Sequence, residues 1–425
     1  MIYLILYNIL FIFIFLFMFP FILSNLIENK QEYCERFGIM KFNRKHKKTI
    51  WLHSASVGEL KLAELLIKNL YNLYPEYSFF VSVITPAAKE LGKKLTIKTE
   101  KIFYLPFDFI LFLRKIFKMF YPNILILVET ELWPGLILYS KIINKNTKIV
   151  LVNGRISDKS FKVYYFLKFF FKYILNKIDL FLMREDSDYR NILKLGVNKE
   201  KVFLTGNMKF DLINLKEKIQ PPDYISEIKN YWKKIFIAAS IREGEENIIV
   251  DVYSKIKKEI QELKLIFVPR HLNKIKTIET ILKEKDIKYI KRTNISNRLN
   301  FIKDIDVLLV DTIGELLYFY SISDVIFVGG SLLKKFKGHN IIEPASLCKL
   351  VIFGQYIESF KEIANLLKKN NVGFEVKSSK ELEEKLLYFL NNPEICKEIG
   401  KNAKKIIQAN QGIVYKNIEY IENFL

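Results

Sequence analysis

From Thr49 onward, short apolar segments alternate along the chain with longer segments of helical periodicity. The short segments are rich in β-branched residues and predict buried strands, and the segments between them are long enough to form crossover helices. This alternation predicts an α/β fold with parallel sheets built from repeated βαβ units. The predicted strands are residues 50–53, 79–84, 102–105, 124–128, 149–152, 180–183 and 202–204, then 235–239, 265–268, 288–290, 307–310, 325–328 and 351–353.

A polar segment with two adjacent prolines, residues 212–223, separates the two sets of predicted strands. Such a segment makes few core contacts and is typical of an interdomain linker. We therefore expect one Rossmann-like, doubly wound domain at 49–211 and a second at 224–405, facing each other across a cleft. Residues 406–425 have helical spacing and predict a C-terminal helix that packs against either domain.

The first 27 residues carry no charged side chain. About 20 apolar residues in a helix cross a hydrocarbon core about 30 Å thick. No basic residue precedes the apolar run and no small-residue cleavage pattern follows it, so residues 1–27 fit an uncleaved membrane anchor better than a signal peptide. Residues 28–48 are rich in Lys and Arg, which predicts that the rest of the chain lies on the cytoplasmic face. A buried core helix at 1–27 is the alternative.

The composition excludes a disordered chain and a small disulfide-rich module. Half of the 425 residues are hydrophobic, and 14% are aromatic. The 67 Lys and Arg residues against 46 Asp and Glu residues give a net charge of +21, which favours phosphorylated substrates, anionic lipids or nucleic acid as partners. The three widely spaced cysteines predict neither a disulfide framework nor a metal site, and they favour a reducing compartment.

Four sites that follow predicted strands share a helix-cap residue with Glu three positions later, which is the spacing of a capping box. Satisfying backbone donors at the start of a helix is the simplest role for each of these glutamates. Because the carboxyl ends of parallel strands meet at one edge of a sheet, the same helix starts would also direct positive dipole ends towards an anionic ligand. The pairs are Ser56 with Glu59, Ser240 with Glu243, Thr312 with Glu315, and Asn340 with Glu343.

Further ionisable residues follow other predicted strands. Glu129 and Glu131 come directly after residues 124–128, and paired carboxylates in a partly desolvated site can differ in pKa, which leaves one as a base. A solvated loop is the alternative for these two acids. Lys209 offers a cation that can balance an anion. Arg270 has the fork geometry suited to binding phosphate.

In their order along the chain, these motifs resemble those of the 3-deoxy-D-manno-octulosonic acid (Kdo) transferases of lipopolysaccharide assembly, which are membrane-anchored glycosyltransferases of the GT-B class. The resemblance implies a GT-B fold and runs from the anchor almost to the C-terminus. The motifs that carry it are residues 53–59, 129–134, 153–157, 206–211, 268–271, 311–316, 327–331, 338–340 and 343–344.

The resemblance also implies a reaction and a set of site residues. The family transfers Kdo from CMP-Kdo to the lipid A precursor at the inner membrane, with inversion at the anomeric carbon and without a metal or another cofactor. Glu59 matches the family's catalytic base, and Glu129 and Lys209 match its transition-state-stabilising pair. The residues that match its CMP contacts are Pro269, Arg270, Ile313, Gly314, Glu315, Asn340, Ile341, Ile342 and Glu343; further candidates are Ser56, Glu131, Ser240 and His339.

The chain departs from the family pattern at three places. Where the family usually has Ser-Thr-His before a Gly-Glu-Glu sequence, this chain has Ser240, Ile241 and Arg242. Lys337 replaces a glycine and adds a cation near the expected ligand, and Gly154 replaces an alanine, which we expect to loosen a turn. His339 and Glu343 alone are too few ligands for a closed metal site, so no metal is predicted.

Two further segments interleave aromatic and basic residues, 107–121 and 161–176. Such segments are typical of helices that lie in a lipid interface, and ordinary core helices with solvated lysines are the alternative. Two other functions compete with the Kdo transferase interpretation. One is a GT-B enzyme that uses a UDP-sugar, such as a lipid A disaccharide synthase or a peptidoglycan glycosyltransferase. The other is a nucleic-acid-binding protein, but no RNP, zinc-finger or helix-turn-helix pattern occurs, so we predict no nucleic-acid partner.

Overall fold

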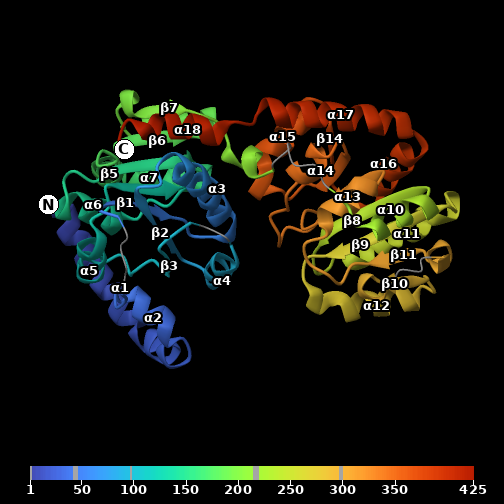
Figure 1. The fold of residues 1–425 in the computed structure, drawn as a ribbon, viewed down its shortest axis with the longest axis horizontal. Coiled ribbons are helices and arrows are strands. Elements are labelled where there is room, and N and C mark those ends of the chain that lie inside the picture. The colour runs from blue at the N-terminus through green and yellow to red at the C-terminus, as the bar shows by residue number, and fades with distance from the viewer. Residues whose placement is uncertain (1, 42–45, 96–97, 214–219, 296–299) are drawn as a thin grey trace. The chain divides into compact units, whose positions relative to one another are not determined.

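The computed structural model in Figure 1 describes residues 2–41, 46–95, 98–213, 220–295 and 300–425. Contacts divide the chain into two compact units. The first contains the chain up to Leu212 together with Asn410–Leu425, and the second contains Ile213–Ala409. Of the predicted linker at 212–223, residues 214–219 lie outside the described residues, and a helix begins at Asp223.

The first unit is built on a seven-stranded parallel sheet with the order β3-β2-β1-β4-β5-β6-β7. Its strands are β1 (Lys48–His53), β2 (Tyr77–Val83), β3 (Lys101–Tyr104), β4 (Ile124–Val128), β5 (Lys148–Gly154), β6 (Leu180–Met183) and β7 (Val202–Leu204). Its helices are α1 (Ile2–Glu28), α2 (Lys30–Arg36), α3 (Val57–Leu73), α4 (Pro86–Lys94), α5 (Ile110–Phe120), α6 (Pro134–Ile143), α7 (Asp158–Phe166), α8 (Lys168–Leu175), α9 (Asp186–Lys194) and α18 (Ile413–Glu422), with short 3-10 turns at Lys199–Lys201 and Met208–Leu212.

Strand β4 shows why this sequence forms a buried parallel strand. All five of its residues are buried, and successive side chains point to opposite faces of the sheet. Leu125 and Leu127 pack in the core with α5, α6 and α8, whereas Ile124, Ile126 and Val128 pack in the core with α3 and α18. A strand covered by helices on both faces is apolar at every position rather than at alternate positions.

The second unit contains another seven-stranded parallel sheet, with the order β10-β11-β9-β8-β12-β13-β14. Its strands are β8 (Lys234–Ile241), β9 (Leu263–Pro269), β10 (Tyr289–Lys291), β11 (Val307–Leu309), β12 (Val325–Val328), β13 (Leu350–Gly354) and β14 (Gly373–Val376). Its helices are α10 (Asp223–Tyr231), α11 (Glu246–Glu259), α12 (Ile275–Glu284), α13 (Leu316–Ile322), α14 (Ile342–Ser346), α15 (Lys361–Lys369), α16 (Ser379–Asn391) and α17 (Pro393–Ala409), with 3-10 turns at Leu272–Lys274, Arg292–Asn294, Asn300–Asp304 and Glu358–Phe360.

The predicted α/β fold with two doubly wound parallel sheets is confirmed. The first strand of each unit lies inside its sheet: β1 lies between β2 and β4, and β8 lies between β9 and β12. The order of the strands reverses at this point, and open parallel sheets bind ligands at such a topological switch point. The prediction of one helix at 406–425 is wrong. Helix α17 runs to Ala409, and α18 begins at Ile413 after Gly412, whose φ is +90°. Both oxygens of Asp211 accept N–H groups at the start of α18, at 2.7 Å from the nitrogens of Gly412 and Val414, so α18 belongs to the first unit.

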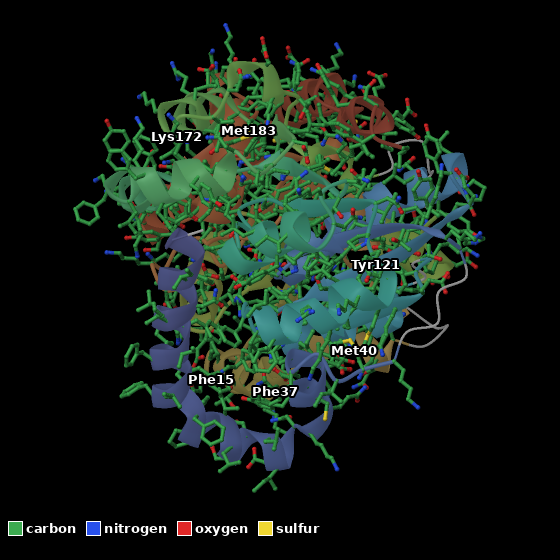
Figure 2. All side chains as sticks on the ribbon, turned by 90° about the vertical axis from the view of Figure 1, so that its left-hand side faces the viewer. Phe15, Phe37, Met40, Tyr121, Lys172 and Met183 are labelled. Carbon is green, nitrogen blue, oxygen red and sulfur yellow. The ribbon has the colours of Figure 1, made fainter. Side chains whose placement is uncertain are left out.

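Helix α1 meets the length and apolarity required to cross a membrane over Tyr7–Glu28. Only 6% of the residues in its most apolar window are buried, so it is not the buried core helix that was the alternative. One face packs on the first unit through aromatic rings, and Figure 2 shows Phe15 beside Phe37, with ring centroids 6.3 Å apart. The Tyr7 hydroxyl donates to Asp108 at 2.5 Å, and Asp108 also accepts N–H groups from the first turn of α6.

The two aromatic and basic segments differ in their burial. Helix α5 within residues 107–121 presents Leu113, Ile116 and Phe117 to the core, as the core-helix alternative requires. The segment 161–176 forms α7 and α8, where Phe166 and Phe169 are 85% and 84% exposed. Helices α7 and α8 therefore expose large apolar side chains of the kind expected at a lipid interface, as α1 also does.

Candidate active site

Glu59 lies in the first turn of α3, directly after the carboxyl end of β1. The predicted capping box is present here: Ser56 accepts the Glu59 N–H at 3.4 Å, and the Glu59 carboxylate accepts from the N-cap backbone. Its Oε2 atom also accepts the Ala55 N–H at 2.5 Å, and its Oε1 atom accepts the Ser56 hydroxyl at 3.1 Å. The same side chain therefore caps α3 and lies at the carboxyl end of β1, where open parallel sheets bind ligands.

The pKa of Glu59 is raised to about 7. Burial is the largest cause, because desolvation disfavours the charged carboxylate, and repulsion from Glu131 and then from Glu129 adds to it. The hydrogen bonds from Ala55 and Ser56 act in the opposite direction without cancelling these effects. A carboxyl group with this pKa can accept a proton and release it near neutral pH.

Glu131 is held by a chain of hydrogen bonds that begins inside the sheet. The Trp51 indole N–H donates to the Ser82 hydroxyl at 2.8 Å, and Ser82 lies 2.9 Å from Nδ1 of the buried His53. If Ser82 donates to Nδ1, then Nε2 of His53 carries the proton and donates to Glu131 at 3.3 Å. The Trp133 indole N–H donates to the same Glu131 oxygen at 2.7 Å. The acid predicted after β4 is therefore oriented by residues of β1 and β2.

Glu129 forms a buried ion pair with Lys209, with 3.1 Å between Lys209 Nζ and Glu129 Oε1. Glu129 has a φ of +61°, which is costly for a glutamate, and Asn153 has a φ of +52°, which an asparagine adopts more readily. The Asn153 amide joins the pair: its nitrogen donates to Glu129 at 3.3 Å, and its oxygen accepts the Met208 N–H at 2.9 Å. The backbone beside Lys209 is thus fixed to the carboxylate that Lys209 neutralises.

Asn153 is missing from the residues predicted for the site. An Asn directly after a predicted strand and before Gly154 is the available sequence signal, since Asn tolerates a positive φ. The expected loosening of a turn by Gly154 is wrong, because Gly154 is the last residue of β5. A Cβ atom there would lie 2.7 Å from the sulfur of Met183, which Figure 2 labels, so a larger residue at this position would require the Met183 side chain to shift.

Three of the four predicted capping boxes fall in the second unit, and none of these three is formed. Ser240 has a φ of +56° at an irregularity in β8, and α11 begins only at Glu246, so Ser240 and Glu243 cap no helix. Thr312 does contact the Glu315 carboxylate, but α13 starts after Glu315. All three pairs have the residue spacing of a capping box, but the helices begin at other residues because the local backbone is not helical where the motif requires it.

The third absent box is at Asn340 and Glu343. The Asn340 oxygen accepts the Ile342 N–H at 2.9 Å, and its amide nitrogen donates to Glu343 at 3.0 Å. Helix α14 starts at Ile342, so its N-cap residue is Ile341, which makes no side-chain cap hydrogen bond. Since the side chains of Ile341 and Ile342 are buried, this segment can present only its backbone and its polar side chains to a ligand.

Glu315 is engaged by three donors within the second unit. It forms an ion pair with Arg292 at 2.8 Å and accepts the Tyr224 hydroxyl at 2.5 Å and the Thr312 hydroxyl. Burial opposes ionisation of Glu315, but these hydrogen bonds outweigh it and lower its pKa. The neighbouring turn is open, because Ile313 is 85% exposed and a Cβ on Gly314 would meet no atom within 4 Å.

The carboxyl ends of β8, β9 and β12 bring the remaining predicted residues near one another. Pro269 ends β9, and Arg270 is exposed directly after it. His339 approaches the turn after β12, where a Cβ on Gly330 would lie 2.8 Å from its ring. Glu245, which was not predicted as a site residue, is fully buried and holds this turn by accepting the N–H groups of Gly330, Ser331 and Leu332, at 2.6, 3.0 and 2.9 Å.

Comparison with known proteins gives matches to both units. The family model of the 3-deoxy-D-manno-octulosonic-acid transferases matches residues 31–212, and that of the group 1 glycosyl transferases matches residues 235–406. A solved UDP-GlcNAc 2-epimerase from Neisseria meningitidis, bound to UDP-GlcNAc, has a TM-score of 0.57 at 14% identity over 88% of this chain and 100% of its own. That likeness shows the shared fold alone.

Two curated relatives are similar over most of this chain. A bifunctional glycosyltransferase/methyltransferase from Fusobacterium nucleatum is 37% identical over 88% of the chain, which spans only 59% of that longer protein. A 3-deoxy-D-manno-octulosonic acid transferase from Rickettsia bellii is 32% identical over 92% of this chain and 91% of its own length. With both units matched and nearly the whole of the Rickettsia enzyme covered, this chain belongs to the 3-deoxy-D-manno-octulosonic acid transferase family and is a glycosyltransferase.

Proposed function

We propose that this chain transfers Kdo from CMP-Kdo to the lipid A precursor at the cytoplasmic face of the inner membrane, by a metal-independent, inverting reaction. The observation that carries the proposal is the Glu59 carboxyl group. Backbone hydrogen bonds fix it at the start of α3, and its pKa of about 7 suits a base that works near neutral pH.

In the proposed step, an acceptor hydroxyl oxygen attacks the anomeric carbon of Kdo from the side opposite to the phosphate. The new carbon–oxygen bond forms as the bond from the anomeric carbon to the phosphate oxygen breaks. CMP leaves with the electron pair of that bond, and Glu59 takes the proton of the hydroxyl. Attack opposite to the leaving group inverts the anomeric centre.

The ion pair of Glu129 and Lys209 would stabilise the charges that develop in this step. A carboxylate stabilises an oxocarbenium-like centre, and an ammonium group stabilises the departing phosphate. Asn153 and the backbone at Met208 hold both groups before substrate arrives, so little reorganisation is needed. In the second unit, Arg270 and the segments at Ile313–Glu315 and Asn340–Glu343 would supply the contacts to CMP.

The proposed location rests on α1 and on the two exposed phenylalanines of α7 and α8. The exposed apolar length of α1 suits an anchor, and the basic residues that follow it suit the cytoplasmic face. Phe166 and Phe169, together with Lys162 and Lys168, would rest in the lipid headgroup region. An acylated acceptor would then reach the first unit without leaving the membrane.

The test of the proposed function is a transfer assay on the full chain in detergent. CMP-Kdo and a tetraacylated lipid A precursor are supplied, and CMP release and the mass of the acceptor are both measured. We expect both to change together, with each added Kdo giving one mass increment and the final mass giving the number of residues added. Matched reactions contain UDP-GlcNAc or UDP-glucose as the donor. Transfer from a UDP-sugar and none from CMP-Kdo would reject the proposal in favour of the UDP-sugar alternative.

The pH dependence of transfer provides a second test, because Glu59 must be ionised to accept a proton. With a pKa of about 7, the rate should rise with pH through about 7 and level off above it. Replacing Glu131 with Gln removes the stronger of the two repelling charges, so the rising limb of kcat/KM should move to lower pH. Burial remains in the variant, and the limb should stay above 4.5, the usual pKa of a glutamate. The exposed Glu76→Gln is the matched control, and an unshifted limb in Glu131→Gln would contradict this account of Glu59.

A further inference from the structure

Arg270, which the proposed function assigns to CMP, belongs to a cationic cluster in the second unit, and Arg242 of this cluster has no role in the proposed reaction so far. Arg242 follows β8, and Arg270 follows β9 in the adjacent register position, since Ile241 pairs with Pro269. The Arg242 guanidinium donates from Nε to Nε2 of His339 at 3.2 Å and from Nη1 to Nε2 of His271 at 2.6 Å. Arginine has no acceptor atoms, so both imidazoles accept these hydrogen bonds.

The two histidines hold Arg242 without neutralising its charge. Burial is the largest cause that lowers the pKa of His339, to about 3, and Arg270 and Arg242 lower it further. Burial and the neighbouring Arg242 lower the pKa of His271 as well, so both rings are neutral near pH 7. Across the described residues, the Arg242 guanidinium makes no ion pair with a carboxylate. The positive charges of Arg242 and Arg270 repel each other at this site, and this repulsion exceeds the attraction of Arg242 to the nearby Glu245 carboxylate.

The position of the cluster is that of a ligand site. Strand β8 lies between β9 and β12 at the topological switch point of the sheet. Glu245 accepts the backbone N–H of Arg242 at 3.0 Å and also holds the Gly330 turn, so the backbone on both sides is fixed. The Arg242 side chain is fixed as well, because its guanidinium lies 4.9 Å from the ring centre of Phe336. A guanidinium uses five N–H donors, of which the histidines take two, so donors remain for an anion.

We infer that Arg242, acting with Arg270, binds the phosphate of the donor nucleotide. This inference rests on the proposed function, which makes a cytidine monophosphate ester the donor. Arg242 is also where the chain departs from the usual family sequence, which has His at this position. An arginine is charged at every working pH and presents a fork that matches two phosphate oxygens, whereas a neutral histidine offers one donor. In this chain the two histidines orient the cation that contacts the phosphate.

The experiment compares the binding of CMP and of cytidine to the full chain by isothermal titration calorimetry. The variants are Arg242→Gln, Arg242→Lys and the exposed Lys334→Gln, which removes the same charge from the loop that follows β12. We expect Arg242→Gln to weaken CMP binding about 10- to 100-fold and to leave cytidine binding unchanged. Arg242→Lys should fall between the parent and Arg242→Gln, because it keeps the charge and loses the fork. Lys334→Gln should bind CMP as the parent does.

Other binding results would overturn either the inference about Arg242 or the proposed donor. Equal losses for CMP and cytidine in both Arg242 variants would show a structural role and overturn the inference. An unchanged CMP affinity in Arg242→Gln would overturn it as well, and so would an equal loss in Lys334→Gln, since a general positive field would then explain binding. If the parent bound neither CMP nor cytidine, the proposed donor would be wrong, and the inference that depends on it would fall with it.

Discussion

Replacing Glu59 with Gln should reduce the rate of Kdo transfer about 10²- to 10⁴-fold, which is the contribution typical of a positioned general base. Gln keeps the shape of the side chain and an oxygen that can accept the Ala55 N–H, and it is an accepted third residue of a capping box. The start of α3 should therefore be preserved while the group that takes the proton is lost. Steady-state CMP release at saturating CMP-Kdo and acceptor measures this effect.

The matched control is Glu64→Gln, which makes the same change five residues further along α3, where the side chain is half-buried. The control should transfer Kdo at the parent rate. CMP binding by Glu59→Gln should also equal that of the parent, since the proposed nucleotide contacts lie in the second unit. A Glu59→Gln protein with the parent rate would remove Glu59 as the base while leaving the identity of the reaction intact.

The sheets could be predicted because local sequence decides which strands are fully buried. Residues 124–128 were predicted with the bounds that β4 has. A short run of five apolar residues is typical of a strand that helices cover on both faces, and all five residues are buried. Strand β14 was missed, because Gly373 and Glu375 interrupt the apolar pattern and Glu375 pairs with Lys368. The error at 406–425 has a different origin. The break depends on Asp211, which lies about 200 residues away in sequence and caps α18.

The local structure of a candidate site residue could be predicted where a short motif determines it. Glu59 follows a strand and its cap Ser56, and both the capping box and the partly buried carboxyl group are present. Ser240 and Glu243 have the same spacing, but Ser240 adopts a positive φ at a bulge, and no sequence spacing reveals a backbone angle. Sequence spacing thus identified the possible caps, while backbone conformation decided which of them formed.

The partners of the site residues could not be predicted, since they arise from strand pairing. His53 reaches Glu131 because β1 pairs with β4 in the register that sets His53 opposite Leu127. Arg242 meets His271 because β8 and β9 end at the same level of their sheet. Each of these contacts joins residues that are separated by at least 29 positions. The structure therefore adds which of these residues contact each other and with what geometry.

Replacing Lys209 with Met should lower the stability of the protein by about 3–5 kcal/mol, because it leaves the buried Glu129 carboxylate without its counter-charge. The same change should reduce kcat about 10²- to 10³-fold if Lys209 stabilises the departing phosphate. A single variant cannot separate these two effects. The double variant Glu129→Gln with Lys209→Met removes both charges, and its Gln oxygen can still accept from Asn153.

We therefore expect the double variant to regain most of the lost stability and none of the lost activity. Thermal unfolding in detergent measures the first quantity, and steady-state CMP release at saturating substrates measures the second. The matched control removes the exposed ion pair of Arg190 with Asp186, which lies on α9. Its loss should change the free energy of unfolding by only about 0–1 kcal/mol, because exposed ion pairs contribute little. If activity returned together with stability in the double variant, Glu129 and Lys209 would serve the fold alone. Removing the Glu129 charge restores the balance of buried charges, but it does not replace the Lys209 charge that acts on the transition state. A double variant that is stable and inactive would therefore assign the pair to the reaction.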